Sequence, residues 1–333
     1  MIIIGLIGLL SILSFWAYDY YVKRVKVGQY IREDAPYHHK SKQGTPTAGG
    51  IIFSLCIVAL SLVINYLQPL PLYSLFIVLT LGSLGIGFYD DLMKILNKRN
   101  LGLRARDKLF LQLLISTVAW FILYMNNQYF IDKFGCGFTT LIFADKSIDL
   151  GWFYLIFLFV FFSGTTNATN LTDGLDGLLA SVSLSTFLAF VTIFLIDPVL
   201  FSSNIIYLLL GIICFISIFL YYNFPKAKIF MGDAGSMTIG SLFVYFCIVS
   251  KTEPYFLFLG YIYFLVALSV ILQVLYFKFT NGKRLFNITP LHHHFELMGY
   301  NEKAILLRFN LVNSIFIFVG LFLWLYKFIR GGI

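Results

Sequence analysis

Charged side chains are scarce in this 333-residue sequence, where Asp, Glu, Lys and Arg together make up 12% of the chain. Soluble domains carry about twice that share. Hydrophobic residues account for 59% of the chain, and the mean hydropathy is +0.85. Because so few polar groups cannot cover a protein surface in water, the composition excludes a soluble globular protein and predicts an integral membrane protein.

Cysteine is also scarce. The four cysteines, Cys56, Cys136, Cys214 and Cys247, include no C-x-x-C pair, and three of them fall in apolar runs. Neither a disulfide framework nor a thiolate metal site is therefore expected. Basic residues are missing ahead of the first apolar run, which predicts an uncleaved first helix in place of a removable signal peptide.

Long apolar runs, in contrast, recur along the whole chain. A helix needs about 20 apolar residues to cross roughly 30 Å of hydrocarbon, and the short alternating segments of a membrane β-barrel are absent. The sequence therefore predicts an all-α, polytopic membrane protein with about ten transmembrane helices. We expect them at residues 1–20, 48–66, 73–89, 109–126, 150–168, 176–196, 203–222, 236–251, 255–277 and 309–327.

The distribution of positive charge predicts how these helices are oriented. If ten helices alternate, the polar loops after the first, third, fifth, seventh and ninth contain 19 of the 24 Lys and Arg residues. Loops rich in Lys and Arg remain in the cytoplasm, so both termini are expected outside. The net charge of +8 is thus attributed to topology and to attraction for anionic lipids or substrates, not to nucleic-acid binding.

The unusual polar residues all fall in these five cytoplasmic loops. Loops that are far apart in the sequence but meet on one membrane face can form a composite site, and the outside loops contain nothing comparable. The five segments are HHKSKQGTPTAGG (38–50), YDDLMKILNKRNLGLRARDK (89–108), NATNLTDGLDG (167–177), NFPKAKIFMGDAGS (223–236) and PLHHHFE (290–296).

Asp90 and Asp91 follow the third apolar run directly. A charge deeper in the bilayer would cost about 2.5–3.5 kcal/mol or more, so a position at the cytoplasmic rim is expected. Adjacent residues on a helix point about 100° apart. One aspartate is therefore expected to face the site and the other a lysine such as Lys94, with a solvated helix end as the alternative for the pair.

The third loop repeats polar residues at every third position, with Asn167, Asn170, Asp173 and Asp176. A helical or 3₁₀ turn would align all four on one side, and the two glycines of the loop would leave its backbone open to a docking substrate. The alternative is an elaborate helix N-cap, because Asn and Asp favour that position. The final Glu of an EF-hand is missing.

Asp233 lies between glycines at the start of the eighth apolar run. Oxygen donors from separate loops, without thiolates, favour Mg²⁺ or Mn²⁺ over zinc. Mg²⁺ binds through one or two carboxylates together with substrate phosphates. Asp233 with Asp90 or Asp91 would therefore suffice as a magnesium site.

Three consecutive histidines, His292, His293 and His294, are more than half of the five in the chain. They cannot all bind one metal ion, because a helix or a strand points neighbouring side chains in different directions. A zinc site is thus unfavoured. We expect the cluster to hold phosphate oxygens or to move a proton, with a structural role for one of the three.

Basic residues complete the same face, and we expect a ring of Lys40, Lys42, Lys94, Lys98, Arg99, Arg104, Arg106 and Lys108. Carboxylates for a metal, cations for phosphate and a glycine-rich backbone are the components of phosphoryl transfer. The apolar body of the protein indicates that one substrate is a lipid that reaches the site from the bilayer.

The five segments, in this order, resemble those of the phospho-N-acetylmuramoyl-pentapeptide transferase family, the bacterial lipid I synthases. The resemblance runs from about residue 30 to residue 300. It implies a single integral membrane transferase domain over residues 1–333 in the bacterial cytoplasmic (inner) membrane, commonly as a homodimer. It also implies that undecaprenyl phosphate attacks UDP-N-acetylmuramoyl-pentapeptide with Mg²⁺, giving lipid I and UMP for peptidoglycan synthesis.

The resemblance also implies roles for individual residues. Asp233 is expected to bind the magnesium ion, and one of Asp90 and Asp91 to deprotonate the lipid phosphate. The three histidines would lie near the pyrophosphate, and Phe230 would stack on the uracil ring. The expected substrate-binding residues are Lys42, Thr45, Lys94, Asn167, Asn170, Asp173, Asp176, Asn223 and Phe230.

Two other functions are considered. A sister enzyme of the same superfamily moves N-acetylglucosamine-1-phosphate from its UDP sugar to a polyprenyl phosphate, but the contiguous PLHHHFE segment favours the muramoyl enzyme. A proton- or metal-coupled transporter would need charges near the middle of the bilayer and interrupted helices in corresponding halves. Here the acidic residues cluster at one rim, and no internal repeat is present.

Overall fold

A computed structural model describes residues 2–24, 45–47, 49–97 and 102–331 of the chain. Within these residues, ten helices are long and apolar enough to cross a membrane, which confirms the predicted fold class. They are α1 (Ile2–Arg24), α2 (Gly49–Leu67), α3 (Tyr73–Leu96), α4 (Ala105–Met125), α6 (Tyr154–Thr172), α7 (Leu178–Ile196), α8 (Ser203–Asn223), α9 (Gly232–Ser250), α11 (Tyr261–Phe279) and α13 (Glu302–Gly331).

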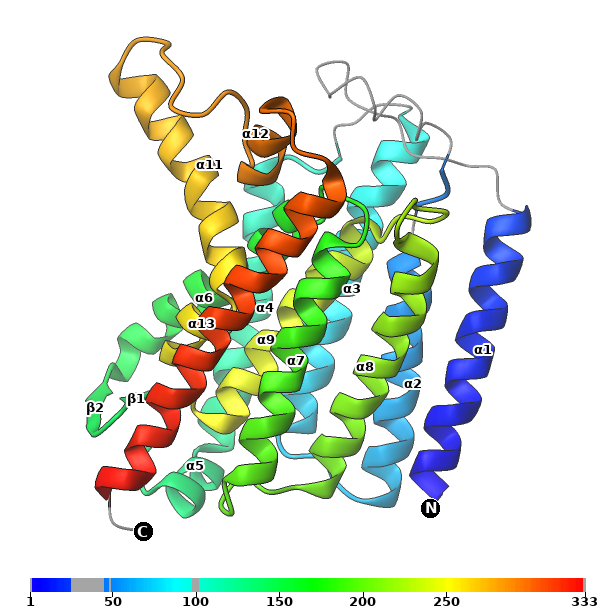
Figure 1. The fold of residues 1–333 in the computed structure, drawn as a ribbon. Coiled ribbons are helices and arrows are strands. Elements are labelled where there is room, and N and C mark those ends of the chain that lie inside the picture. Colours follow the sequence, from blue (N-terminus) through cyan, green and yellow to red (C-terminus); the bar gives the residue numbers. More distant parts are fainter. Residues whose placement is uncertain (1, 25–44, 48, 98–101, 332–333) are drawn as a thin grey trace.

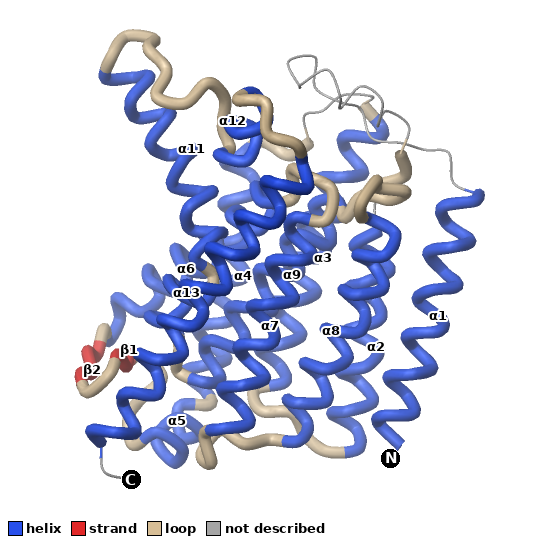
Figure 2. Tube along the Cα trace, in the orientation of Figure 1, coloured by secondary structure: helices blue, strands red, loops and turns tan. Residues whose placement is uncertain are grey.

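Shorter elements lie at the two ends of this bundle (Figure 2). They are the helices α5 (Asn127–Phe134), α10 (Phe256–Leu259) and α12 (Leu291–Leu297), the 3₁₀ turns η2 (Gly151–Phe153) and η3 (Glu253–Tyr255), and the strands β1 (Thr140–Phe143) and β2 (Lys146–Asp149). The strands form an antiparallel hairpin in which Thr140 lies opposite Asp149. This hairpin is the one departure from an all-helical fold in the part of the chain that the structure describes.

All ten predicted spans are present, and three of their boundaries differ from the prediction by six or seven residues. The third helix continues to Leu96, so the Asp90–Asp91 pair lies inside a helix and not after its end. The ninth begins at Tyr261, because η3 and α10 occupy the preceding residues. The tenth begins at Glu302, because the helix includes polar turns that precede the apolar run.

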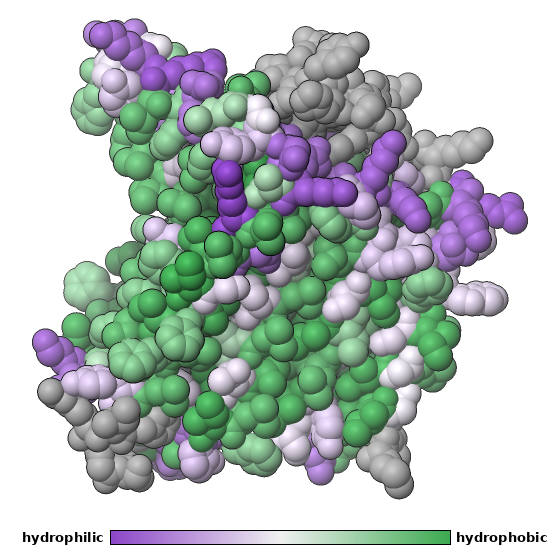
Figure 3. Space-filling model, viewed as in Figure 1, coloured by the Kyte–Doolittle hydropathy of each residue, from purple (hydrophilic) through white to green (hydrophobic). Residues whose placement is uncertain are grey.

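The first turn of α1 and the end of α13 lie at the same end of the bundle, and α12 lies at the opposite end (Figure 1). An even number of spans requires this arrangement. Hydrophobic side chains cover the middle of the molecule in Figure 3, and hydrophilic ones gather toward the ends. This is the distribution expected for a protein that spans a bilayer.

Helix α9 forms the centre of the bundle and packs against α3 and α6. Nearly all of its residues are buried. Its contact with α3 is unusually close, because a Cβ atom on Gly87 would overlap the backbone carbonyl of Asp233. The glycine therefore allows the end of α3 that carries Asp90 and Asp91 to lie directly against the first turn of α9.

The other end of α9 is fixed by a buried cation. The ammonium group of Lys251 donates to the carbonyl oxygens of Phe138 (2.6 Å) and Thr140 (2.8 Å). Its Nζ lies 4.0 Å from Oε1 of Glu253, which accepts a hydrogen bond from the hydroxyl of Tyr154. These contacts join the β-hairpin, α6 and the end of α9.

The close packing at Gly87 can be tested with Gly87→Ala, for which we expect a loss of about 1–3 kcal/mol of stability through overpacking. Thermal unfolding of the detergent-purified protein measures it. Gly85→Ala is the matched control, because a Cβ at Gly85 meets open space two residues earlier on the same helix. Equal melting temperatures for the two variants would contradict the close approach of α3 and α9.

Candidate active site

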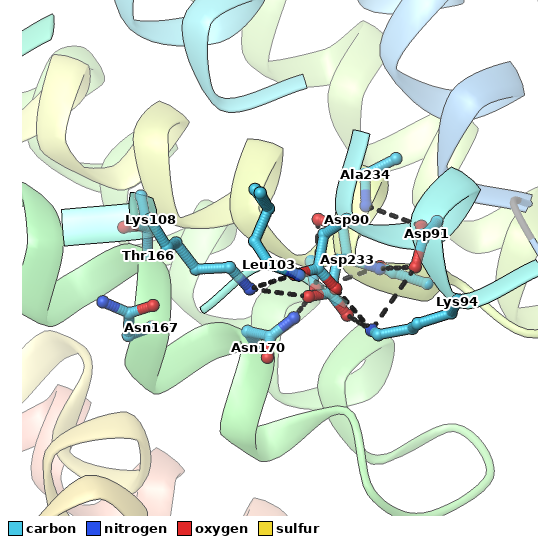
Figure 4. A network of polar contacts seen from close by, with 12 residues as sticks. Asp90, Asp91, Lys94, Leu103, Lys108, Thr166, Asn167, Asn170, Asp233 and Ala234 are labelled. Carbon is cyan, nitrogen blue, oxygen red and sulfur yellow. Dashed lines mark hydrogen bonds and ion pairs between the residues drawn. The ribbon is translucent and has the colours of Figure 1, made fainter. Parts of the chain in front are cut away.

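Three carboxylates meet where the end of α3 contacts the start of α9 (Figure 4). Asp90, Asp91 and Asp233 each offer an oxygen, and these oxygens all lie within 4.8 Å of one another. Asp90 and Asp91 are only 2% and 5% exposed. A solvated helix end is therefore excluded for the aspartate pair.

Two lysines form ion pairs with this acid cluster. Nζ of Lys94 lies 2.7 Å from Asp90 Oδ2 and 2.8 Å from Asp233 Oδ1. Nζ of Lys108, on α4, lies 3.2 Å from Asp90 Oδ1 and 2.9 Å from Asp233 Oδ2. Each lysine thus bridges α3 and α9 by contacting one oxygen of Asp90 and one oxygen of Asp233.

Asp91 has a different set of partners. Its two carboxylate oxygens accept hydrogen bonds from the backbone N–H groups of Asp233 and Ala234, both at 3.1 Å. These groups belong to the first turn of α9, where backbone N–H groups have no partner within the helix. Asp91 therefore caps α9 from a neighbouring helix, and the positive end of the helix dipole stabilises its charge.

The prediction that one aspartate of the pair faces the site and the other a lysine such as Lys94 was wrong, because both do both. Both carboxylates face Asp233, and Lys94 contacts Asp90 at 2.7 Å and Asp91 at 3.7 Å. Neighbouring helical residues point in different directions, but the two rotatable bonds of each aspartate side chain allow both carboxylates to reach Asp233. The prediction that the two differ in role agrees with their partners, which are backbone N–H groups for Asp91 and mainly lysines for Asp90.

The third loop does not align its four polar residues, because α6 ends at Thr172. Asn167 and Asn170 lie on α6, and their amides donate to Gln112 of α4 (3.2 Å) and Ser236 of α9 (3.0 Å). Asp176, in the following turn, accepts a hydrogen bond from the backbone of Ala227 (2.9 Å). The predicted one-sided row was therefore wrong, as was the N-cap alternative, because these residues end one helix and connect it to two others.

Asp173 follows the last residue of α6 and lies in the electrostatic field of the acid cluster. Burial raises the pKa of its carboxyl well above the usual range, and the carboxylates of Asp233 and Asp91 raise it further. Asp173 therefore lies beside the acid cluster as a carboxyl group that favours a bound proton.

The histidines lie on the short helix α12, above the turn that follows Asp173. His292 is buried against Gly174, where its ring occupies the space that a Cβ would fill. His293 Nδ1 lies 2.6 Å from Oε2 of Glu296, and His294 Nδ1 accepts the N–H of Asn287 at 3.2 Å. The three side chains thus have three different surroundings, as expected for consecutive helical residues.

Asn223 lies near the site, but its side chain supports the loops around the site. Its Oδ1 accepts the N–H of Gly177 at 2.7 Å, and its Nδ2 donates to the carbonyl of Ile229 at 2.8 Å. The side chain is buried. Both ends of the amide therefore hold the third and fourth loops together.

Phe230 and Thr45 are brought to the same face. The N–H of Phe230 donates to the carbonyl of Pro46, and its own carbonyl accepts the N–H of Gly49, both at 2.9 Å. These bonds join the first and fourth loops and leave the Phe230 ring half-buried. Thr45 is partly exposed beside them, and Lys42 lies outside the described residues.

Two contributors were missed from the sequence as site residues. Lys108 was expected only as one of a ring of basic residues, although it contacts two carboxylates of the site. Gln112 was not singled out, although an amide inside a predicted apolar span is a signal of a polar contact between helices. Its position one turn after Lys108 is a second signal.

The fold and this site define a polytopic membrane enzyme suited to phosphorylated substrates. Residues 73–251 match glycosyl transferase family 4. The chain is 40% identical over 316 residues to the phospho-N-acetylmuramoyl-pentapeptide-transferase of Shouchella clausii (92% of each chain) and 42% identical over 311 residues to that of Caldanaerobacter subterraneus (91% of each). It is 38% identical over 296 residues to that of Listeria monocytogenes (87% of each). The chain therefore belongs to glycosyl transferase family 4 and, within it, to the phospho-N-acetylmuramoyl-pentapeptide-transferases.

The supporting geometry of Asn223 predicts the effect of Asn223→Ala. The variant leaves two buried backbone groups without partners, each at a cost of about 1–3 kcal/mol, so we expect a clearly lower melting temperature. Asn204→Ala, at the opposite end of the same helix, is the control and should melt near the wild-type temperature, because its amide makes only long bonds of 3.3 Å. A variant of Asn223 with normal melting but weakened substrate binding would instead favour direct substrate contact.

Proposed function

We propose that this chain transfers phospho-N-acetylmuramoyl-pentapeptide from UDP to undecaprenyl phosphate, forming lipid I and releasing UMP. The observation that supports this most directly is the identity of about 40% with transferases of that name along nine-tenths of the chain. The site geometry supports it independently, because carboxylates and lysines from three helices converge at one end of a membrane bundle.

The acid cluster fits a magnesium ion. Its donors are carboxylate oxygens only, and hard oxygen ligands are those that Mg²⁺ prefers. Asp233 would hold the ion, because its carboxylate is engaged by lysine side chains, whereas both oxygens of Asp91 are taken by backbone N–H groups. When bound, the ion neutralises phosphate oxygens and stabilises the charge that develops during transfer.

The lysines perform the rest of this neutralisation. Donor and acceptor are both anionic phosphates and repel each other. Lys94 and Lys108 place two positive charges between α3, α4 and α9, in a site largely shielded from water, where charge stabilisation is strongest. Asp90 is then the better candidate of the pair for taking a proton from the lipid phosphate, because Asp91 is committed to the first turn of α9.

The surrounding loops would bind the nucleotide part of the donor. The half-buried ring of Phe230 offers a stacking surface for uracil, and its backbone is fixed by the first loop. Asn170 and Asp173 line the approach from α6, and Thr45 and Lys42 would extend it from the first loop. The α12 histidines, of which His292 packs on Gly174, would contact the pyrophosphate.

The proposal extends to cellular location. The site end of the bundle would face the cytoplasm of a bacterial inner membrane, as the positive-inside rule predicts for loops that contain most of the Lys and Arg residues. The whole chain would act as one transferase domain. A homodimer is proposed on family resemblance alone.

The test is UMP release by the purified protein from UDP-N-acetylmuramoyl-pentapeptide. We expect release only with undecaprenyl phosphate and Mg²⁺, and loss of release with EDTA that returns when Mg²⁺ is added. UDP-N-acetylglucosamine under the same conditions should yield no UMP. Release from that sugar alone would identify the sister transferase instead and would overturn the proposal.

The metal assignment is tested with Asp233→Asn, for which we expect turnover to fall by at least about 10²–10³-fold, the loss typical of removing a charge-stabilising group. Asp107→Asn is the control, because it removes a half-exposed carboxylate at the same end of the bundle. Near-normal turnover by Asp233→Asn would refute the assignment, and equal losses in both variants would show a non-specific charge effect.

A further inference from the structure

Gln112 places a carboxamide inside the apolar span of α4, where it joins α4 to α6. Its Nε2 donates to the hydroxyl of Thr166 at 3.0 Å, and its Oε1 accepts the amide N–H of Asn167 at 3.2 Å. Both Gln112 and Thr166 are completely buried. The donor and the acceptor of the side chain are thus both satisfied by neighbouring residues of one helix.

Stability does not explain this amide. Hydrogen bonds between membrane helices contribute little to stability on average, and a leucine of similar volume would pack between α4 and α6 without desolvating a polar group. The distinctive property of the amide is directional. Two bonds of opposite polarity to consecutive residues of α6 fix both the height and the rotation of α4 relative to α6.

That register matters for the acid cluster. Lys108 precedes Gln112 by four residues, so both lie on the same face of α4. The Nζ of Lys108 must reach Asp233 and Asp90 together, at 2.9 and 3.2 Å. A shift of α4 along its axis would move the Cα of Lys108 relative to both carboxylates, and the flexible side chain would have to change rotamer to keep both contacts.

The α6 side of the contact leads to the same cluster. Asn167 precedes Asn170 by three residues on α6, and Asn170 donates to the hydroxyl of Ser236 at 3.0 Å. Ser236 lies one turn after Asp233 on α9, and its hydroxyl donates to the carbonyl of Gly232. The polar contacts thus run from α4 through α6 to the turn of α9 that carries Asp233.

We propose that Gln112 is a positioning residue for Lys108, fixing the height of α4 so that the lysine bridges the two carboxylates. The hydrogen bonds of the Gln112 amide go to Thr166 and Asn167 and not to the carboxylates. The proposal rests on the proposed transferase reaction only for its kinetic readout. Its second readout, the chemical reactivity of Lys108, needs no turnover.

The experiment compares Gln112→Leu with the wild type by graded acetylation with acetic anhydride and mass spectrometry of the lysine peptides. Lys278 is the internal standard, because it is an exposed lysine at the end of α11, away from the carboxylates that Lys108 contacts. We expect the reactivity of Lys108 relative to Lys278 to rise several-fold, since the ion pairs of Lys108 are weakened. We also expect kcat to fall roughly tenfold at nearly constant KM, as for a misplaced catalytic group.

Three further variants separate positioning from structure. Thr166→Val removes the acceptor of the Gln112 amide and should reproduce both changes, and it also serves if Gln112→Leu does not fold. Thr166→Ser keeps the hydroxyl and should retain wild-type values. Ser116→Ala is the matched control, because it removes a buried hydroxyl one turn further along α4 that bonds only within that helix.

The outcomes are distinct. Unchanged Lys108 reactivity in Gln112→Leu and Thr166→Val would overturn the proposal, whatever happens to turnover. A rise in KM with constant kcat would overturn it in favour of a binding role. If the variants alter Lys108 reactivity while the wild-type protein shows no transferase activity on either UDP-sugar, the positioning is supported and the proposed function is rejected.

Discussion

The site depends on two lysines that allow two aspartates to be buried at the end of a membrane bundle. An isolated carboxylate in such surroundings costs several kcal/mol. Here Lys94 and Lys108 each contact one oxygen of Asp90 and one of Asp233, so all four oxygens are engaged. Since α3, α4 and α9 each contribute to this network, the interaction that neutralises the carboxylates also joins the three helices.

The third carboxylate joins the site to the core. Asp91 accepts two backbone N–H groups of α9, and it can do so only because Gly87, one turn earlier on α3, leaves no Cβ against the Asp233 carbonyl. The charge balance of the cluster follows from these roles. Three carboxylates and two ammonium groups leave one net negative charge, which a divalent cation would reverse to one positive charge. A positive site is what two anionic phosphates require in order to approach each other.

Hydropathy and charge distribution were sufficient to predict ten helices and the convergence of distant loops, because both are averages over many residues. The residue-level geometry depended on packing that no local pattern contains. The three-residue spacing of Asn167, Asn170, Asp173 and Asp176 indicated one continuous face, yet α6 ends at Thr172 and Asp176 bonds to Ala227. Asn223 was predicted to bind substrate from its place in a motif, whereas its two hydrogen bonds join loops. Such partners become visible only when the helices are assembled.

The placement of charge along the bundle favours transfer chemistry over transport. Between Asp233 at one end of α9 and Lys251 beyond the other, the helix contains no charged residue, and α6 contains none from Tyr154 to Thr172. A transporter needs polar groups near the middle of the bilayer, but here the charges are confined to the two ends. At the end away from the site, Lys251 is buried and held by two carbonyl oxygens and by Glu253, and the β-hairpin covers it. In the part of the chain that the structure describes, the acid cluster thus lies at the end of the bundle that carries α12, which is the end where the proposed donor and lipid acceptor would have to meet.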